Sequence, residues 1–268
     1  MKGIALSEVV RIADQLFPFS QAEPWDNCGI QIGDPSDHVE AIAFSLDAIP
    51  ETVAFAADNS CGLLVSHHPV IFEPIRSITP DSLVGRTLLH AARRGVGILS
   101  LHTNLDSARG GLNDHLAEII GLEDIVTPTP ALCARFGRLP TGTRISRVAE
   151  KLSTALNISG IRVIAREDLP VKKVFCVTGS GMGYLKEALA YNADLMVTGD
   201  VRYHDAREAL EMGIPVIDAG HYGLEKIAVK LLSSAFLEQF TKLGIHVTCV
   251  PCRLEKDPFQ IYIPSGGS

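Results

Sequence analysis

Six side chains that can bind metal ions lie at or just beyond the ends of predicted strands. They are His67, His68, His102, Asp106, His221 and Glu225. Imidazole is a good ligand for zinc, iron, nickel and copper, and carboxylates extend the choice to manganese. A carboxylate can bridge two ions, and two ions about 3.5–4 Å apart can activate a water that they share. The set therefore predicts a site for one or two divalent metal ions.

The spacing of these residues also favours a shared site. In two places a carboxylate follows a histidine by four residues, at His102 and Asp106 and again at His221 and Glu225. This spacing suits a strand end that runs into a helix start, where both side chains can reach one point. The adjacent pair of histidines precedes Pro69, and both can bind one centre only if their strand has already ended. The remaining candidates are interpreted as ordinary surface or core histidines: His38, His90, His115 and His246.

The elements that must position these residues alternate between strands and helices. We expect strands at 29–32, 39–46, 63–66, 96–101, 161–165, 173–178, 194–198, 215–219, 245–250 and 259–263. We expect helices at 7–16, 50–58, 82–94, 111–120, 146–156, 184–191, 205–212 and 224–240. The stretch 127–130 alternates threonine and proline and is the best candidate for a linker. Strands that alternate with helices predict an α/β sheet, in which ligands bind beyond the carboxyl ends of the strands.

The two halves of the chain repeat each other. Residues 39–65 align with residues 171–197 without a gap, a shift of 132 residues, and each stretch is predicted as strand, helix, strand. A second match places residues 102–106 on residues 221–225. We therefore expect an α/β fold of two similar, duplicated lobes with mixed sheets that face each other across a metal-binding cleft. The first lobe covers residues 1–126, with the C-terminal strands of 243–268 returning to it, and the second covers 127–242.

Composition excludes several classes of protein. The chain has 268 residues, of which 46% are hydrophobic and 21% charged, so it is not intrinsically disordered. Its net charge of −7 argues against an extended nucleic-acid surface. No apolar run approaches the roughly 20 residues that span a membrane. With no signal peptide predicted, the six cysteines are interpreted as reduced thiols of a cytoplasmic protein.

Five ordered motifs carry a resemblance to a known family. They are Glu23–Gly33, Ser66–Pro69, His102–Asp106, Thr198–Asp200 before Tyr203–Asp205, and Asp218–His221 before Glu225. The series resembles the dinuclear metal-centre family of GTP cyclohydrolase 1 type 2 homologues, also called the interacting-factor-three family, over nearly the whole chain. The resemblance implies two metal ions per chain (Zn, Fe or Mn), with His102 at or next to them, and a toroidal homohexamer. It assigns the ligands to His67, His68, Asp106, His221 and Glu225.

The sequence departs from the family pattern in places. Members often carry Gly-x-Gly-Arg-x-Gly after the linker, whereas this chain has Arg135–Pro140 there, which puts a substrate role of that segment in doubt. The chain is also too short for the domain that longer members insert between their lobes. The roles of Trp25, Asp26 and Asn27 do not follow from the sequence.

These observations favour a metal-dependent hydrolase. The resemblance implies GTP as the substrate, with water adding at C8 of the purine and ring opening releasing formate, while Asp200 or His204 transfers protons. Gly179, Gly181 and Gly183 lie where a predicted strand is joined to a helix. Their backbone N–H groups could bind phosphate, or the glycines could form only a tight turn. Arg202 is a further candidate for substrate contact. Two alternatives remain: a hydrolase of another nucleotide or phosphoester, and a non-enzymatic metal-binding scaffold or regulator that forms a ring.

Overall fold

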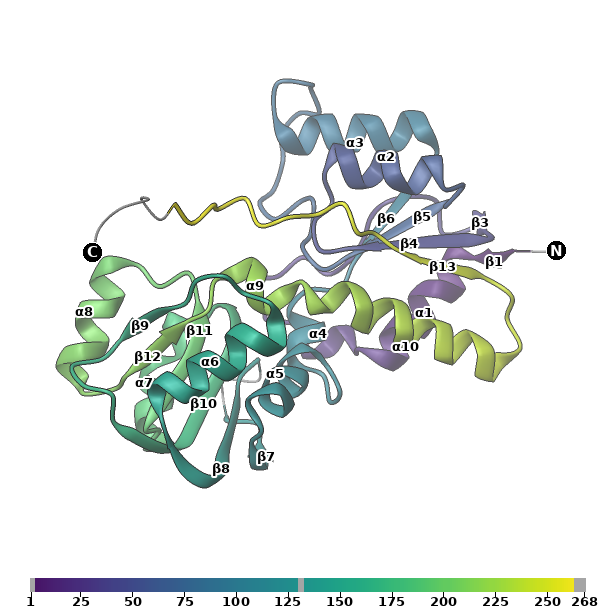
Figure 1. Cartoon of the computed structure of the whole chain (residues 1–268). Coiled ribbons are helices and arrows are strands. Elements are labelled where there is room, and N and C mark those ends of the chain that lie inside the picture. Colours follow the sequence, from purple (N-terminus) through teal and green to yellow (C-terminus); the bar gives the residue numbers. More distant parts are fainter. Residues whose placement is uncertain (1–2, 130–132, 263–268) are drawn as a thin grey trace. The chain divides into compact units, whose positions relative to one another are not determined.

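The computed structural model describes residues 3–129 and 133–262, and Figure 1 shows its ribbon. The chain divides into two compact units. Unit 1 contains residues 3–112 and 226–255, and unit 2 contains the described residues of 113–225 and 256–262. In the described part of the chain, no helix is both long enough and apolar enough to span a bilayer.

Unit 1 is built on a five-stranded sheet with the order β13-β4-β5-β6-β2. Its strands are β2 (Gly29–Ile32), β4 (Ala41–Ser45), β5 (Leu63–Ser66), β6 (Gly97–Ser100) and β13 (Thr248–Pro251). Four of them run parallel, and only β2 pairs antiparallel, with β6. A separate antiparallel pair joins β1 (Ile4–Ala5) to β3 (His38–Val39).

Helices cover both faces of this sheet (Figure 1). On one face lie α2 (Pro50–Asp58) and α3 (Leu83–Arg94), and on the other lies α10 (Ile227–Leu243), against which α1 (Leu6–Leu16) packs. The unit also contains the short helices η1 (Phe19–Gln21) and α4 (Thr103–Ser107). Alternate residues of β4 serve the two faces, as the pleat of a strand requires. Ala43 belongs to the core beneath α2 and α3, whereas the ring of Phe44 lies 5.5 Å from that of Phe236 in α10. Because both faces are covered, the central parallel strands β4, β5 and β6 are apolar up to the serine that ends each of them.

Unit 2 is built on a six-stranded sheet with the order β7-β8-β10-β11-β12-β9. Its strands are β7 (Glu123–Val126), β8 (Arg135–Arg144), β9 (Arg162–Ile164), β10 (Pro170–Ser180), β11 (Leu195–Gly199) and β12 (Val216–Asp218). Its helices are α5 (Leu112–Ile120, all but the first residue), α6 (Ile145–Leu156), η2 (Met182–Tyr184), α7 (Leu185–Ala190), α8 (Tyr203–Met212) and α9 (His221–Glu225). The central strands β10, β11 and β12 are parallel, and the outer strands pair antiparallel.

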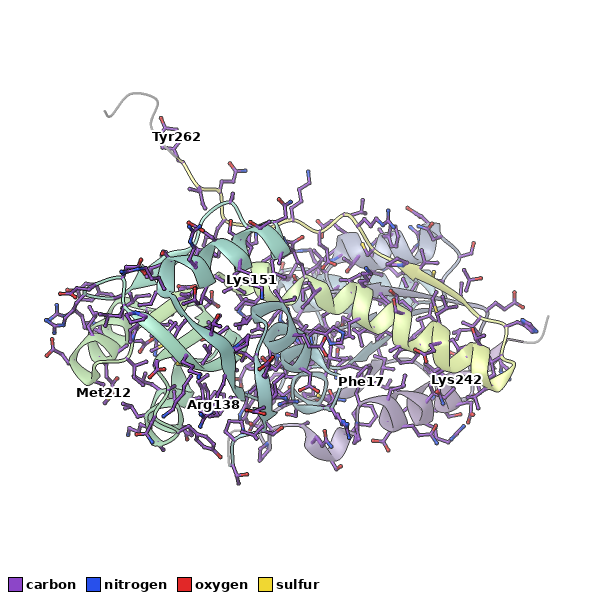
Figure 2. All side chains as sticks on the ribbon, turned by 60° about the horizontal axis from the view of Figure 1, so that its bottom comes forward. Phe17, Arg138, Lys151, Met212, Lys242 and Tyr262 are labelled. Carbon is purple, nitrogen blue, oxygen red and sulfur yellow. The ribbon has the colours of Figure 1, made fainter. Side chains whose placement is uncertain are left out.

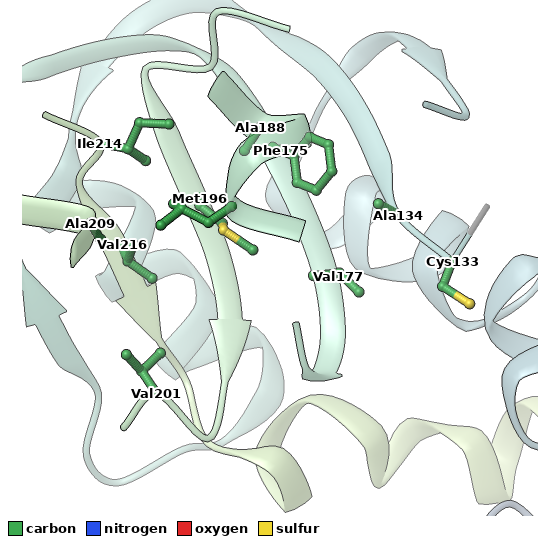
Figure 3. Close-up of a cluster of buried hydrophobic side chains, with 11 residues drawn as sticks. Cys133, Ala134, Phe175, Val177, Ala188, Met196, Val201, Ala209, Ile214 and Val216 are labelled. Carbon is green, nitrogen blue, oxygen red and sulfur yellow. The ribbon is translucent and has the colours of Figure 1, made fainter. Parts of the chain in front are cut away.

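One core of unit 2 lies where α7 and α8 meet the central strands (Figure 3). Phe175, Met196 and Val216 come from three adjacent strands, and Ala188 and Ala209 come from the two helices. The small alanines let the helices approach the sheet closely.

Figure 2 shows the side chains of the described residues. Among those labelled, Arg138 comes from β8 and Met212 ends α8, while Lys242 lies in the last turn of α10 in unit 1.

The predicted duplication is confirmed at the level of strand register. In unit 1, Ile42 of β4 pairs with Leu63 of β5. In unit 2, Val174 of β10 pairs with Leu195 of β11, and both positions are displaced by 132 residues. In each unit a third parallel strand then leads into a five-residue helix, α4 or α9. The α/β fold of two similar units with mixed sheets is therefore confirmed.

Several stretches differ from the sequence prediction: strand β7 and helix α4 were not expected, and the helix expected at 224–240 is the pair α9 and α10. Two further differences have a clear physical reason. The segment after the expected linker forms the long strand β8, whose first buried positions are Arg135, Gly137 and Leu139. Such positions do not give the alternating apolar pattern by which strands are predicted. At the C-terminal end, residues 259–262 form no strand, and their apolar side chains are exposed. Residue 263 and the linker residue Pro130 lie outside the described residues.

Candidate metal centre

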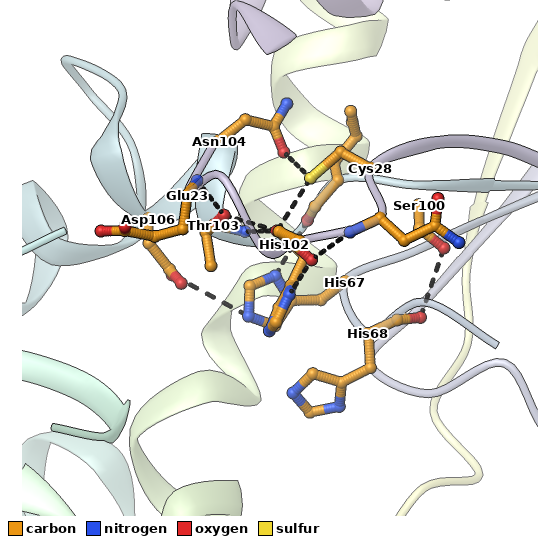
Figure 4. Close-up of polar contacts among 12 residues, drawn as sticks. Glu23, Cys28, His67, His68, Ser100, His102, Thr103, Asn104 and Asp106 are labelled. Atoms are coloured by element: carbon orange, nitrogen blue, oxygen red, sulfur yellow. Dashed lines mark hydrogen bonds and ion pairs between the residues drawn. The ribbon is translucent and has the colours of Figure 1, made fainter. Parts of the chain in front are cut away.

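Three imidazoles of unit 1 form one cluster (Figure 4). His67, His68 and His102 each offer a ligand atom, and these three atoms lie within 4.8 Å of one another. The ring centroids of His67 and His68 are 4.9 Å apart, and that of His102 lies 5.2 and 5.6 Å from them. Three nitrogen donors this close together are a suitable ligand group for a transition-metal ion.

Adjacent strand ends bring the three histidines together. Strand β5 ends at Ser66, and β6 ends at Ser100, directly beside it in the register. The backbone N–H groups of His67 and His68 still donate to the carbonyls of Ser45 and Leu46, at 3.2 and 2.9 Å. The chain therefore stays attached to β4 after the regular strand has ended. Because the strand pleat has ended, both imidazoles can turn to the same side, as the sequence analysis required.

Each imidazole of the cluster is held through its Nδ1 atom. The Nδ1 of His67 lies 2.9 Å from the carbonyl oxygen of Leu101. The Nδ1 of His68 lies 2.8 Å from Asp47, and that of His102 lies 2.8 Å from Asp26. A histidine that ligates a metal commonly donates its second ring N–H to a carbonyl or carboxylate in this way. With Nδ1 as the donor, Nε2 keeps its lone pair for an ion, so the donor set fits a divalent cation.

Asp26 is the centre of a buried polar network. Its side chain is fully buried, and it accepts hydrogen bonds from the backbone N–H and hydroxyl of Thr103 and from the thiol of Cys28. Burial alone would raise the pKa of this carboxyl. The hydrogen bonds from His102, Thr103 and Cys28 outweigh the burial and hold the pKa well below its usual range. Burial and the same carboxylate raise the pKa of the Cys28 thiol to about 12.

Asp106 supplies a carboxylate beside this cluster. It lies on the short helix α4, is buried, and places Oδ1 3.9 Å from Nε2 of His67. The helix begins directly after His102, so the four-residue spacing brings both side chains to the same strand end. Unit 1 therefore brings together all four of its predicted ligands: His67, His68, His102 and Asp106.

Unit 2 carries a second histidine–carboxylate group. The Nε2 of His221 lies 2.9 Å from Oε2 of Glu225 on the same helix α9, and Glu225 is buried. The Nδ1 of His221 lies 2.8 Å from Asp200, which repeats the arrangement of His68 and His102. Asp200 has a φ of +52°, an unusual backbone conformation for a residue other than glycine. Asp200, predicted as a proton-transfer group, thus contacts a candidate ligand directly.

Each glycine of the predicted phosphate loop has a different structural environment. Gly179 has a φ of +62°, and a Cβ there would lie 2.4 Å from Oε1 of Glu225. The N–H of Gly181 donates to Thr198 at 2.9 Å, so it already has a partner within the protein. Gly183 has no atom within 4 Å of a Cβ position. The first two glycines therefore serve the packing of the loop against β11 and α9.

The two remaining predicted residues lie at the start of α8. His204 is exposed, and its ring contacts that of Tyr203 at 5.4 Å. Arg202 is exposed and donates to Asp205 at 2.8 Å. Neither residue is buried in a polar site of unit 2.

Sequence reasoning missed two carboxylates of unit 1. The sequence places Asp26 in a motif without assigning it a role, and it assigns no role to Asp47. A signal existed for Asp47, because it follows β4 at the same sheet edge as the histidines. No sequence signal places Asp26 beside His102, since that contact joins residues 76 positions apart through an irregular segment.

The fold and these residues define an α/β protein with histidine and carboxylate groups that can hold a metal ion. The chain belongs to the Duf34/NIF3 (NGG1p interacting factor 3) family, whose model matches residues 4–258. This confirms the resemblance that the five motifs indicate.

Relatives and solved structures extend the comparison. The chain is 31% identical to a "GTP cyclohydrolase 1 type 2 homolog" of Clostridium perfringens, over 95% of this chain and 98% of that one. It is 27% identical to a "GTP cyclohydrolase 1 type 2" of Helicobacter pylori strain J99, over 96% and 98% of the two chains. The structure is similar to the Staphylococcus aureus hypothetical protein SA1388, with a TM-score of 0.89 and 25% identity over 97% and 100% of the chains. It also resembles reduced HcgD from Methanocaldococcus jannaschii, with a TM-score of 0.80 and 25% identity over 92% and 97%.

Proposed function

We propose that this protein is a metal-dependent hydrolase with a dinuclear metal centre that acts on a purine nucleotide or a similar substrate. The proposed ligands are His67, His68, His102, Asp106, His221 and Glu225. One observation carries the proposal. The Nδ1 atom of each of these histidines has an oxygen partner at 2.8 or 2.9 Å, which favours Nε2 as the metal-binding atom.

The residues of the chain have distinct parts in this proposal. When bound, divalent ions would lower the pKa of a coordinated water toward neutrality and so supply a nucleophile. Asp26, Asp47 and Asp200 each fix the orientation of one imidazole. Glu225 and Asp106 add negative charge, which favours binding of cations over anions. Of the two groups proposed for proton transfer, Asp200 contacts His221 and His204 is exposed.

The substrate class is proposed from the relatives. Relatives from two Helicobacter pylori strains carry the name GTP cyclohydrolase 1 type 2, and others, among them the Clostridium perfringens protein, are named as its homologues. Opening of a purine ring and hydrolysis of a phosphoester both require an activated water, so the same residues would serve either reaction. A panel of nucleotides, assayed for formate and for phosphate, separates these reactions.

Elemental analysis tests the metal centre. We expect two divalent ions per chain after loading with Zn²⁺, Mn²⁺ or Fe²⁺ and removal of excess ions. His221→Ala and Glu225→Ala should lower the metal content and abolish turnover. His246→Ala is a matched control, because His246 is an exposed histidine outside the ligand groups. A protein that retains no metal after any loading, or a hydrolytic rate that survives both ligand substitutions, would contradict the proposal.

The non-enzymatic alternative gives a different result in the same experiments. A metal-binding scaffold would bind the ions but turn over no member of the panel. We also propose, from the family resemblance, that the chain forms a homohexamer. Light scattering should then give six times the mass of one chain, and a monomer at all concentrations would contradict this assembly.

A further inference from the structure

Two large aromatic side chains lie exposed next to the histidine cluster of unit 1. Trp25 is 59% exposed and Phe72 is 51% exposed. Their ring centroids are 5.7 Å apart. Both rings also contact the imidazole of His102 edge-on, at 6.1 and 6.2 Å. We call this pair, Trp25 and Phe72, the aromatic platform.

Polar contacts hold the platform in place from behind. Trp25 directly precedes the fully buried Asp26, which is bonded to His102. On the other side, Asn27 donates to the carbonyl of Ile71 at 2.7 Å, and Gln31 accepts from the N–H of Ile71 at 3.2 Å. The residues that flank the two rings are therefore fixed to the same scaffold. The consecutive residues Trp25, Asp26 and Asn27 thus each have a distinct structural part.

The exposed aromatic surface beside His102 is a candidate binding site for a ligand. Leaving two contacting aromatic rings in water is unfavourable, since burial of apolar area is the main driving force of folding and association. Aromatic rings prefer partners that stack or approach edge-on, and any planar base offers a π-face for stacking. The imidazole of His102 touches both rings, so a ring that covers the platform would lie next to the candidate metal ligands.

We infer that the aromatic platform stacks against a planar heteroaromatic ring of the ligand and so places that ring beside His102. The inference rests on the proposed function, because it assigns the part of that site that selects the substrate by its ring. Contact with a ring tolerates several bases, so the platform selects for planarity more than for one pattern of hydrogen bonds. A phosphate group, which has no ring face to stack, would gain nothing from it.

Intrinsic fluorescence gives a direct test, because Trp25 is the only tryptophan of the chain. We would titrate the full-length, metal-free protein with GTP, with guanosine and with inorganic triphosphate, correcting for absorption with free N-acetyltryptophanamide. We expect saturable quenching by GTP and guanosine and none by inorganic triphosphate. Phe72→Leu should weaken binding about tenfold, equal to about 1.4 kcal/mol, within the range of a base–aromatic stack. Phe72→Tyr should retain binding.

Matched controls separate the platform from the general surface. Phe259→Leu removes another exposed phenylalanine and should leave the titration unchanged. Circular dichroism of each variant shows whether it remains folded. Equal quenching by triphosphate and guanosine, or normal binding by folded Phe72→Leu, would overturn the inference. A fluorescence change on dilution of the protein without ligand would assign the platform to contact between copies, and would also overturn it.

The same measurements distinguish the failure of this inference from the failure of the proposed function. His67→Ala should abolish metal-dependent turnover but retain quenching by guanosine. Quenching without turnover in the unmodified protein would support the platform and contradict the hydrolase. Turnover of a ring-containing substrate with the same KM in Phe72→Leu would support the hydrolase and contradict the platform.

Discussion

The Nδ1 atom of His102 lies 2.8 Å from Oδ1 of Asp26, whose side chain is fully buried. The contact fixes one imidazole of the histidine cluster from behind. The same relation joins His68 to Asp47 in unit 1 and His221 to Asp200 in unit 2. A carboxylate behind a ligating histidine makes Nε2 a better electron donor and fixes the ring orientation.

The first prediction concerns this carboxylate. Asp26→Asn removes the charge that orients His102, and we expect the affinity for Zn²⁺ or Mn²⁺ to fall about 10- to 100-fold. Competition with a coloured chelator measures the affinity. Asp37→Asn, at an exposed aspartate of the same unit, should change nothing. Equal metal affinity in the two variants would show that Asp26 does not act through His102.

The second prediction concerns Gly179. Alanine at this position would need an unfavourable φ of +62°, and its Cβ would meet Oε1 of Glu225 at 2.4 Å. We expect Gly179→Ala to lower the free energy of unfolding by about 1–3 kcal/mol and to displace the carboxylate, which weakens metal binding. Urea unfolding of the metal-free protein measures the first effect and chelator competition the second. Gly183→Ala is the control, because no atom lies within 4 Å of its Cβ position. Equal effects of the two substitutions would contradict the explanation.

The third prediction concerns a buried ion pair. Arg135 on β8 is buried and forms an ion pair with Asp114 in unit 2. Asp114→Ala would remove the carboxylate that pairs with this buried guanidinium, so we expect the free energy of unfolding in urea to fall by up to about 3–5 kcal/mol. The exposed pair of Arg147 and Glu150 offers the contrast, since Glu150→Ala should cost less than about 1 kcal/mol. Similar losses in both variants would mean that burial does not strengthen the Arg135 interaction.

The fourth prediction concerns thiol reactivity. Burial raises the pKa of the Cys176 thiol to about 12, and it raises those of Cys61 and Cys249 to about 11. A raised pKa keeps the thiol protonated, so at pH 8 very little of the Cys176 side chain would be thiolate. We expect these thiols to resist iodoacetamide in the native protein at pH 8, and all six cysteines to react in urea. Peptide mass spectrometry locates the adducts. Rapid alkylation of Cys176 in the native protein would contradict the burial of this side chain on β10.

The sequence predicts the central strands β4, β5, β6 and β11 well because each carries a short apolar run. Strand β5 matches its prediction, and the repeat identified β4 with β10 and β5 with β11 in the correct register. The spacing of His102 and Asp106 predicts a strand end that runs into a helix start, and both residues do follow β6 at the start of α4. These features depend on local pattern, which the sequence contains directly.

Other features depend on contacts between distant residues. Strand β8 was missed because a buried ion pair takes the place of an apolar side chain at Arg135. The role of Asp26 depends on a loop that brings it to His102, and no periodicity describes such a loop. The terminal apolar residues 259–262 have a strand-like pattern, but they do not pair with a described strand. Pattern alone thus predicts elements and fails where tertiary contacts decide the conformation.

The sheet of unit 1 receives its last strand from the far end of the chain. Strand β13 pairs with β4, and α10 covers the adjoining face through Phe236, although both elements follow residues 113–225 of unit 2 in sequence. During synthesis, β4 therefore has one unpaired edge and an uncovered apolar face until about residue 251 has emerged from the ribosome. We expect nascent chains that stop before α10 to be vulnerable to proteases and to bind chaperones, while release of the finished chain allows unit 1 to close.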